Sequence, residues 1–402
     1  MTSNVSVYQI RAEYATIDRL TGQDVRANGV LELLTFGLTT MGLSPRVNIV
    51  RIGHPYRRSK TSNEGIIALE LSKRSKLLRS IIKLFGWNPY LKSSIEWRLG
   101  AYQTDPRNFM DLLSKDEGKR KIFLFDDVTS AFVFSIDYLK RLRRGGGLLI
   151  YDSQNYYSSA PKRVVDNERR FMEMMDLVIT SSYRDRYYYQ KAFSDYASKF
   201  LVIPNCFPPI SYISSPERTL SRDVADSKIG IAITGPSGLG SKAAAEFVST
   251  VGAAFKNLDR KDVVLYLYGK VYDLISQRAD AIKGVEVVNM GLERDRAKYI
   301  HKLSSARIGI NHTNKHSAAN TKKFDYALAG LVILSNPLGA KGEPLPYEYT
   351  YIDEGDLRVK LEWLIENVER LMSWGEENYM QAIRYSITAF NELRRSLEST
   401  LL

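Results

Sequence analysis

Short apolar runs alternate with longer segments of helical spacing along the first half of the chain. Runs of four to six residues bounded by polar or turn residues predict buried strands, because they are too short for buried helices. Residues 29–41 repeat their apolar side chains about every 3.6 positions, which predicts a helix. Such alternation indicates a doubly wound parallel sheet. Its strands are expected at 5–10, 47–52, 121–125, 148–151, 176–181 and 200–204.

The second half repeats this alternation after a polar stretch at 211–227 with the composition of a linker. We therefore predict two α/β domains, at 1–205 and 206–384, and expect a C-terminal helix at 385–402 to pack back on the first. A ligand is expected at the carboxyl ends of the strands, in a cleft between the domains. The second domain should have strands at 229–233, 263–268, 285–288, 308–310 and 331–334, and helices at 242–255, 294–304, 322–330 and from about 357 onward.

Charge is distributed unevenly over the 402 residues, which carry a formal net charge of +12. Residues 1–205 contain 32 Lys and Arg against 21 Asp and Glu, whereas the remainder contains 25 against 24. The basic surface therefore belongs to the first domain. It implies an anionic partner such as lipid headgroups, a lipid phosphate or nucleic acid.

Cysteine and histidine content argues against a disulfide or a metal centre. The chain has one cysteine, Cys206, and four histidines, of which only His312 and His316 are four residues apart, in a loop-like stretch. We expect no metal and no bound cofactor. The first residues lack the charged and apolar regions of a signal peptide, and no apolar stretch approaches the length of a spanning helix. We therefore expect a cytoplasmic protein.

Residues 307–335 combine features of a phosphate site. A short apolar strand leads through a polar loop to a helix that opens with Lys322 and Lys323, ends at Gly330 and precedes another apolar strand. The first turn of a helix offers unpaired N–H groups and the positive end of the dipole, which favour phosphate. The lysine pair could clamp a diphosphate there, and the Asp325 carboxylate could accept hydrogen bonds from sugar hydroxyls.

A glycine-rich loop at 233–240 supplies a second candidate phosphate contact. The loop contains Gly235, follows a predicted strand and leads to Lys242 in the first turn of the next helix, so backbone N–H groups can approach a phosphate. Lys242 could also be a plain solvated helix residue. The loop is not a Walker A motif, because Gly240-Ser-Lys242-Ala displaces the lysine and offers no hydroxyl for Mg²⁺.

The order of these motifs resembles the large retaining family of group 1 glycosyltransferases, which have two Rossmann-like domains in the GT-B fold. The resemblance covers most of the chain and is firmest from Gly147 to Ser335. It rests on residues 151–155 (YDSQN), Glu168, 176–182 (DLVITSS), Arg186, 202–205 (VIPN), 284–288 (GVEVV), 290–291 (MG), Arg294 and 322–330 (KKFDYALAG).

The resemblance implies a nucleotide-sugar donor in the second domain. Lys242, Lys322 and Lys323 would bind its diphosphate, and Asp325 corresponds to the second acidic residue of the family's paired-glutamate motif, which holds the ribose. The first acidic residue is replaced by Ser317, a departure from the family. Loop residues Asn314, His316 or Asn320 could supply the missing contact to the sugar. Otherwise Asp325 is a helix residue stabilised by the dipole, and the histidines are exposed loop residues.

In the first domain, the resemblance directs attention to two polar segments. Asn28 and Gly29 precede the predicted helix, where the family has a glycine-containing turn close to the donor phosphate and the acceptor. Asp152 and Asn155 follow a central strand, where the family often has a histidine. Asp152 could orient an acceptor hydroxyl or act as a base. Alternatively, Gly29 is a plain turn glycine and Asp152 only caps the following helix.

Residues 72–99 combine an apolar helical face with flanking basic residues and tryptophan. This composition suits a helix lying in an anionic membrane interface, and glycosyltransferases that use lipid-linked acceptors often carry such an element. A core-facing helix with a solvated basic side is the alternative. The membrane-facing candidates are Lys73, Arg74, Lys76, Arg79 and Trp87.

These expectations favour a retaining, metal-independent glycosyltransferase that moves a sugar from a nucleotide diphosphate to a hydroxyl of a glycan or lipid-linked acceptor. It would be cytoplasmic, peripheral on the inner face of the membrane, and not primarily a nucleic-acid binder. A nucleotide-sugar epimerase or phosphorylase of the same fold is one alternative. A non-catalytic protein with a degenerate donor site, binding membrane or nucleic acid, is another. Asp126-Asp127 would suit the metal site of the GT-A fold, but that fold has no second Rossmann-like half.

Overall fold

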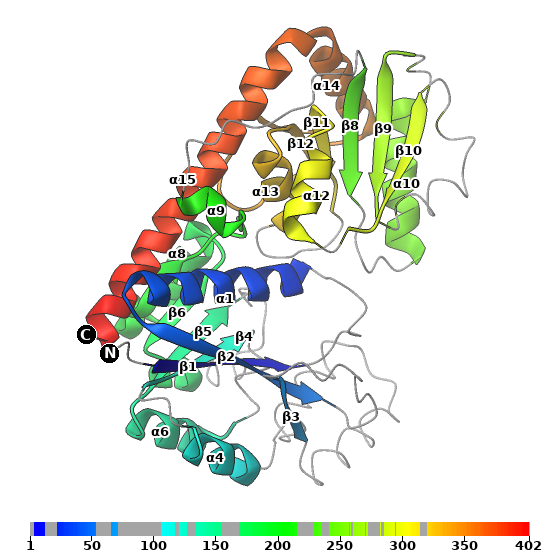
Figure 1. Cartoon of the computed structure of the whole chain (residues 1–402). Coiled ribbons are helices and arrows are strands. Elements are labelled where there is room, and N and C mark those ends of the chain that lie inside the picture. Colours follow the sequence, from blue (N-terminus) through cyan, green and yellow to red (C-terminus); the bar gives the residue numbers. More distant parts are fainter. Residues whose placement is uncertain are drawn as a thin grey trace. The chain divides into compact units, whose positions relative to one another are not determined.

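The computed structural model of the chain contains two compact units (Figure 1). Unit 1 comprises Met1–Asp18, Ala27–Val202 and Asn391–Leu402, and unit 2 comprises Arg19–Arg26 and Ile203–Phe390. The structure describes residues 4–12, 22–53, 66–70, 106–116, 120–126, 134–153, 169–214, 228–234, 241–256, 258, 260–269, 271, 282, 285–293, 295–313 and 320–401.

Unit 1 is built on a seven-stranded parallel sheet in the order β3-β2-β1-β4-β5-β6-β7. Consecutive strands add outward from β1 in one direction and then, from β4, in the other, as in a Rossmann fold. The strands are β1 (Asn4–Ala12), β2 (Ser44–Gly53), β3 (Ile66–Glu70), β4 (Arg120–Asp126), β5 (Gly147–Ser153), β6 (Leu177–Thr180) and β7 (Phe200–Val202). The helices are α1 (Gly22–Thr40), α4 (Pro106–Ser114), α6 (Ile136–Arg144), α8 (Tyr183–Ala192) and the 3₁₀ helix η1 (Ser194–Lys199).

Both faces of this sheet are covered, which explains why its strands are nearly continuous apolar runs. Tyr8 and Phe123 stack at 5.4 Å within the cluster that packs against α4, α6 and α8. Helix α1 covers the opposite face, where Gln9 Nε2 donates to the carbonyl oxygen of Ala27 at 2.8 Å. Figure 1 shows α1 on one side of the sheet and α4 and α6 on the other.

Unit 2 repeats the topology with a six-stranded parallel sheet in the order β10-β9-β8-β11-β12-β13. The strands are β8 (Ile229–Thr234), β9 (Val263–Tyr268), β10 (Glu286–Gly291), β11 (Ile308–Asn311), β12 (Val332–Ser335) and β13 (Glu348–Thr350). The helices are α9 (Ile210–Ser214), α10 (Ser241–Phe255), α12 (Arg296–Leu303), α13 (Thr321–Leu328), α14 (Glu354–Glu366) and α15 (Val368–Leu401), of which the residues from Asn391 onward belong to unit 1.

Alternate side chains of these strands enter two separate cores. Ile231 and Ile233 face α10 and α14, whereas Ala232 faces α12, α13 and α15. Helix α13 ends at Leu328 and is followed by Gly330, whose φ of 71° favours glycine. The hydrogen bonds from Leu331 N to Tyr326 O at 3.0 Å and from Gly330 N to Ala327 O at 2.8 Å form a Schellman motif that directs the chain into β12.

The fold predicted from the sequence is confirmed, because every strand expected from an apolar run is present in one of two parallel sheets. Three features differ. Helix α1 begins at Gly22 rather than at residue 29, the polar stretch at 211–227 begins within helix α9, and the strands β3 and β13 were not predicted. Among the described helices, none is both long and apolar enough to cross a membrane.

Candidate functional site

The candidate site lies where the strand order of unit 2 reverses, between β8 and β11. In open parallel sheets, the chains that leave two such strands run to opposite sides, and the carboxyl edge between them binds ligands. Thr234 ends β8 and Asn311 ends β11. Helix α13 follows β11, so its first turn lies at the same edge.

Tyr326 of α13 joins the ends of these two strands. Thr234 N donates to Tyr326 Oη at 2.9 Å, and Tyr326 Oη lies 3.1 Å from both Thr234 Oγ1 and the carbonyl oxygen of Ile310. Burial raises the pKa of Tyr326, so the phenol stays protonated. The ring lies directly over Gly309, where a Cβ atom would come within 2.6 Å of the ring. Glycine is therefore required at this strand position for the phenol to reach both strands.

Lys322 lies in the first turn of α13, which is capped by Asn320. Asn320 Oδ1 accepts from Lys322 N at 3.0 Å, and Lys322 Nζ donates to the carbonyl oxygen of Thr234 at 3.2 Å. Burial lowers the pKa of Lys322 to about 8, although the nearby Asp325 raises it in part. A bound anion would favour the charged amine and raise this pKa again. The amine and the helix N-terminus therefore offer two favourable interactions to the same phosphate.

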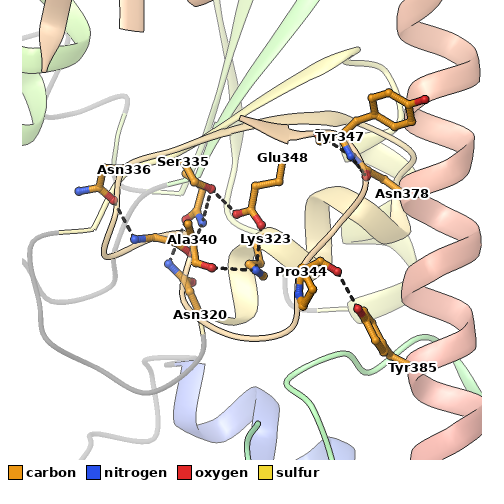
Figure 2. Close-up of polar contacts among 12 residues, drawn as sticks. Asn320, Lys323, Ser335, Asn336, Ala340, Pro344, Tyr347, Glu348, Asn378 and Tyr385 are labelled. Carbon is orange, nitrogen blue, oxygen red and sulfur yellow. Dashed lines mark hydrogen bonds and ion pairs between the residues drawn. The ribbon is translucent and has the colours of Figure 1, made fainter. Parts of the chain in front are cut away.

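Lys323 does not form a clamp with its neighbour, which corrects the expectation of a lysine pair. Its side chain is 0% exposed, and Nζ forms an ion pair with Glu348 Oε2 at 2.9 Å and donates to the carbonyl oxygen of Ala340 at 3.0 Å. Figure 2 shows the ammonium turned toward β13 and the loop after β12. Successive side chains of a helix project about 100° apart, so two neighbouring lysines rarely face one ligand.

Asp325 lies in the second turn of α13 and has a protein partner that the sequence did not predict. Its carboxylate forms an ion pair with Arg296 of α12 at 2.6 Å, and the side chain is 7% exposed. Burial raises the pKa of Asp325, and Arg296 opposes this shift. Arg296 Nε also donates to the carbonyl oxygen of Phe207 at 3.1 Å. Arg296 thus fixes the position of the Asp325 carboxylate, and the carbonyl oxygen of Phe207 fixes Arg296.

An open pocket of about 560 Å³ lies at the carboxyl ends of β11, β12 and β13. His312 Nδ1 and Tyr351 Oη lie 2.7 Å apart on its wall, and their rings stack at 6.0 Å. Its volume falls within the range of small-molecule sites. The lining residues are Thr250, His312, Asn336, Pro337, Tyr351, Ile352, Asp353, Glu354 and Gly355.

The equivalent edge of unit 1 carries an arginine and two carboxylates. Arg11, Asp126 and Asp152 stand in register on β1, β4 and β5. Arg11 Nε forms an ion pair with Asp126 Oδ2 at 3.0 Å, and Arg11 Nη2 donates to Asn28 Oδ1 at 2.6 Å. Asp152 is fully buried at the penultimate position of its strand. Among the described residues, this edge thus combines the Arg11–Asp126 ion pair with the buried carboxylate of Asp152.

Two of the residues expected in a turn lie in a helix instead. Asn28 and Gly29 are within α1, because the helical pattern continues N-terminally from Val30 through Ala27 and Arg26, which are all buried. The pair resembles a turn signal in the sequence, but burial of this helix face outweighs it. Asp152 lies within β5, one residue beyond the predicted end of that strand, and the structure shows no turn at Gly29 that could approach a phosphate.

Several predicted site residues lie outside the described part of the chain. Lys242 is the second residue of α10, as expected, and its side chain is not described. The others are Gly235, Asn155, Asn314, His316, Lys73, Arg74, Lys76, Arg79 and Trp87.

The sequence prediction missed a set of polar residues at the site: Asn311, Ser335, Glu348, Arg296 and Tyr326. One signal for two of them was present, since Asn311 and Ser335 each end an apolar run and so occupy the carboxyl end of a strand. Within the described ranges, no group of three His, Cys, Asp or Glu residues is placed to hold a metal ion.

Comparison with known proteins identifies the fold. No protein-family model matches the chain, and no curated protein matches it by sequence. Among solved structures, a glycosyltransferase from Rickettsia africae superposes with a TM-score of 0.58 at 14% identity, covering 99% of this chain and 98% of that one. Anabaena HepE in complex with UDP gives 0.58 at 10%, covering 99% and 100%. The α,α-trehalose 6-phosphate synthase of Burkholderia multivorans gives 0.60 at 12%, covering 100% of both chains. The chain therefore has the GT-B fold, with two Rossmann-like α/β domains.

Proposed function

We propose that the protein is a glycosyltransferase that moves a sugar from a nucleotide-diphosphate sugar to a hydroxyl acceptor. The observation that carries this proposal is the position of Lys322. Its amine and the capped N-terminus of α13 lie together at the end of β8, where the strand order of the sheet reverses. HepE, which has the same fold, was solved in complex with UDP.

The donor chemistry follows from what these groups can do. A departing nucleoside diphosphate develops negative charge, and preorganised N–H donors and a cation at its position lower the barrier. Lys322 and the first turn of α13 would supply this stabilisation without a metal ion. Lys242, in the first turn of α10, would contact the same diphosphate.

The acceptor would bind to unit 1. Asp152 would orient the attacking hydroxyl or take its proton, and the basic first half of the chain would bind an anionic acceptor such as a lipid-linked phosphate. We propose retention of the anomeric configuration on the motif resemblance.

Peripheral membrane association through residues 72–99 belongs to the same proposal. Its test is retention on anionic vesicles, with a variant neutralised at Lys73, Arg74, Lys76 and Arg79 expected to be released.

Thermal stabilisation by UDP, GDP, ADP and their sugars, in the presence of EDTA, tests the function. A shift in melting temperature with one nucleotide is expected, and it names the base. Proton NMR of the product formed from that donor then reports the anomeric configuration. If no nucleotide or nucleotide sugar stabilises the protein, the donor site is degenerate and the protein is a binding protein of the same fold.

A further inference from the structure

A closed circuit of polar contacts links β13, β12 and β11 to the first turn of α13 (Figure 2). Glu348 Oε1 accepts from Ser335 Oγ at 2.6 Å, and Ser335 Oγ accepts from Asn311 Nδ2 at 3.2 Å. Asn320 Nδ2 donates to Asn311 Oδ1 at 2.9 Å. Asn320 also caps α13, and Lys323 of α13 pairs with Glu348. Both ends of this series of contacts therefore lie in the first turn of the helix.

The ion pair and the strand-end side chains of the circuit are buried. Lys323, Asn311 and Ser335 are each 0% exposed, and the Glu348 side chain is 6% exposed. Removing two charges from water costs several kcal/mol per ion, so a buried ion pair adds little stability compared with apolar side chains of similar volume. Stability alone therefore does not account for this pair. What it provides is a defined geometry, since Lys323 Nζ is held by both Glu348 and the carbonyl oxygen of Ala340, and Glu348 is held in turn by Ser335.

The geometry that it defines is the rotation of α13 about its axis. Lys323 is anchored toward β13, and Lys322, about 100° away around the helix, is then directed toward the end of β8, where its amine meets the carbonyl oxygen of Thr234. The Asn320 cap fixes the same turn from its N-terminal end. A rotation of the first turn would move the Lys322 amine away from the end of β8.

We propose that Lys323 and Glu348 are positioning residues, whose buried ion pair sets the rotation of α13 and so directs Lys322 at the end of β8. The consequence for the donor rests on the proposed function, because Lys322 then contacts the diphosphate. Neither Lys323 nor Glu348 touches the substrate in this account.

The test uses the full chain with both partners replaced, Lys323→Met with Glu348→Met. Apolar replacement of both partners should keep the protein folded, because no buried charge remains without its partner. The exposed pair Lys228 and Glu286, replaced in the same way, is the matched control. The first readout needs no ligand. The pKa of Lys322 is followed by NMR of its ¹³Cε resonance, assigned through Lys322→Arg.

We expect the wild type and the control to titrate near 8, and the double variant to titrate closer to the ordinary value of 10.5, because its amine leaves the buried position. The Kd of the nucleotide sugar should weaken about tenfold in the double variant, which corresponds to the loss of one charge-assisted hydrogen bond. Lys323→Arg, which retains the charge, should recover part of this affinity.

A folded double variant in which neither the pKa of Lys322 nor the donor Kd changes would overturn the proposal. The positioning role and the proposed function can also be tested separately. If the wild type binds no nucleotide sugar but the pKa of Lys322 still moves in the double variant, the proposed function fails while the positioning role stands.

Discussion

The carboxyl edges of the two sheets share one topology and differ in chemistry. In unit 1, the described residues of the edge include Arg11 and two carboxylates, Asp126 and Asp152. In unit 2, the described residues form two ion pairs, Lys323 with Glu348 and Arg296 with Asp325, and the amine of Lys322 lies at the reversal of strand order. An edge of the first kind suits a group that must lose a proton, and one of the second kind suits an anion. The topology fixes where a ligand binds, and the residues at the strand ends fix which ligand it is.

The largest expected effect is on stability, when the cation of the buried ion pair at each edge is removed. Lys323→Met alone leaves the Glu348 charge buried, and we expect a loss of about 3–5 kcal/mol in the free energy of unfolding. Arg11→Met should cost less, because Arg11 is 18% exposed and water can approach Asp126 once it is removed. Urea unfolding of each variant, followed by circular dichroism, measures both costs.

The control for this comparison is the double replacement of Lys323 and Glu348. It should recover most of the stability that the single change loses, because no uncompensated charge is left. Equal losses in the single and double variants would show that packing, rather than the buried charge, determines the cost.

Asp152→Asn tests whether the edge of unit 1 acts in turnover and the edge of unit 2 in donor binding. We expect turnover to fall about a hundredfold, the usual contribution of a positioned acid–base group, while the Kd of the donor is unchanged. Asp137→Asn, an exposed carboxylate of the same unit, is the control and should have wild-type turnover. A large change in donor Kd with Asp152→Asn would place the donor contact in unit 1 and contradict the division of roles.

Gly309→Ala tests the close approach of the Tyr326 ring. The new Cβ atom would overlap the ring, and we expect a cost of about 1–3 kcal/mol. In a Tyr326→Leu background, the same substitution should cost much less, because the smaller side chain leaves room. A cost that is the same in both backgrounds would show that the ring does not require glycine there.

Lys322→Met tests the buried amine through the pH dependence of stability. The folded pKa of Lys322, about 8, is below its ordinary value of 10.5, so the unfolded chain binds more protons between these values. The stability contributed by Lys322 is therefore lowest below pH 8 and rises by up to about 1.4 kcal/mol per pH unit toward 10.5. Relative to the wild type, Lys322→Met should be most stable below pH 8 and lose this advantage as the pH rises.

The exposed Lys256, replaced by Met, is the control for this titration and should show no such trend. Urea unfolding at several pH values between 7 and 10.5 compares the three proteins. A stability difference between wild type and Lys322→Met that does not depend on pH would mean that the amine is solvated.

The sequence predicted the sheets well because parallel strands are buried on both faces. Runs such as residues 331–334 carry that information locally. Strand β13 escaped prediction because its three residues, Glu348–Thr350, contain no apolar run at the edge of the sheet. Helix α1 was predicted seven residues too short, since Asn28 and Gly29 are typical of turns and only tertiary burial shows otherwise.

The candidate site was predictable in position and only partly in its contacts. The helix start at residues 321–323 and the preceding strand gave its location. The partner of Lys323 lies 25 residues along the chain, on a strand that was not predicted, and Arg296 reaches Asp325 from another helix. Pairings of this kind depend on how the elements pack, which local patterns do not record.

Calorimetric titration of the nucleotide sugar into wild type, Lys322→Ala and the control Lys256→Ala tests the central claim most directly. The account predicts that one nucleotide sugar binds to the wild type and the control with equal affinity. For Lys322→Ala, it predicts a Kd at least about tenfold weaker, as expected for the loss of a charged hydrogen-bond donor. Equal affinity for all three proteins would contradict a donor phosphate at the N-terminus of α13.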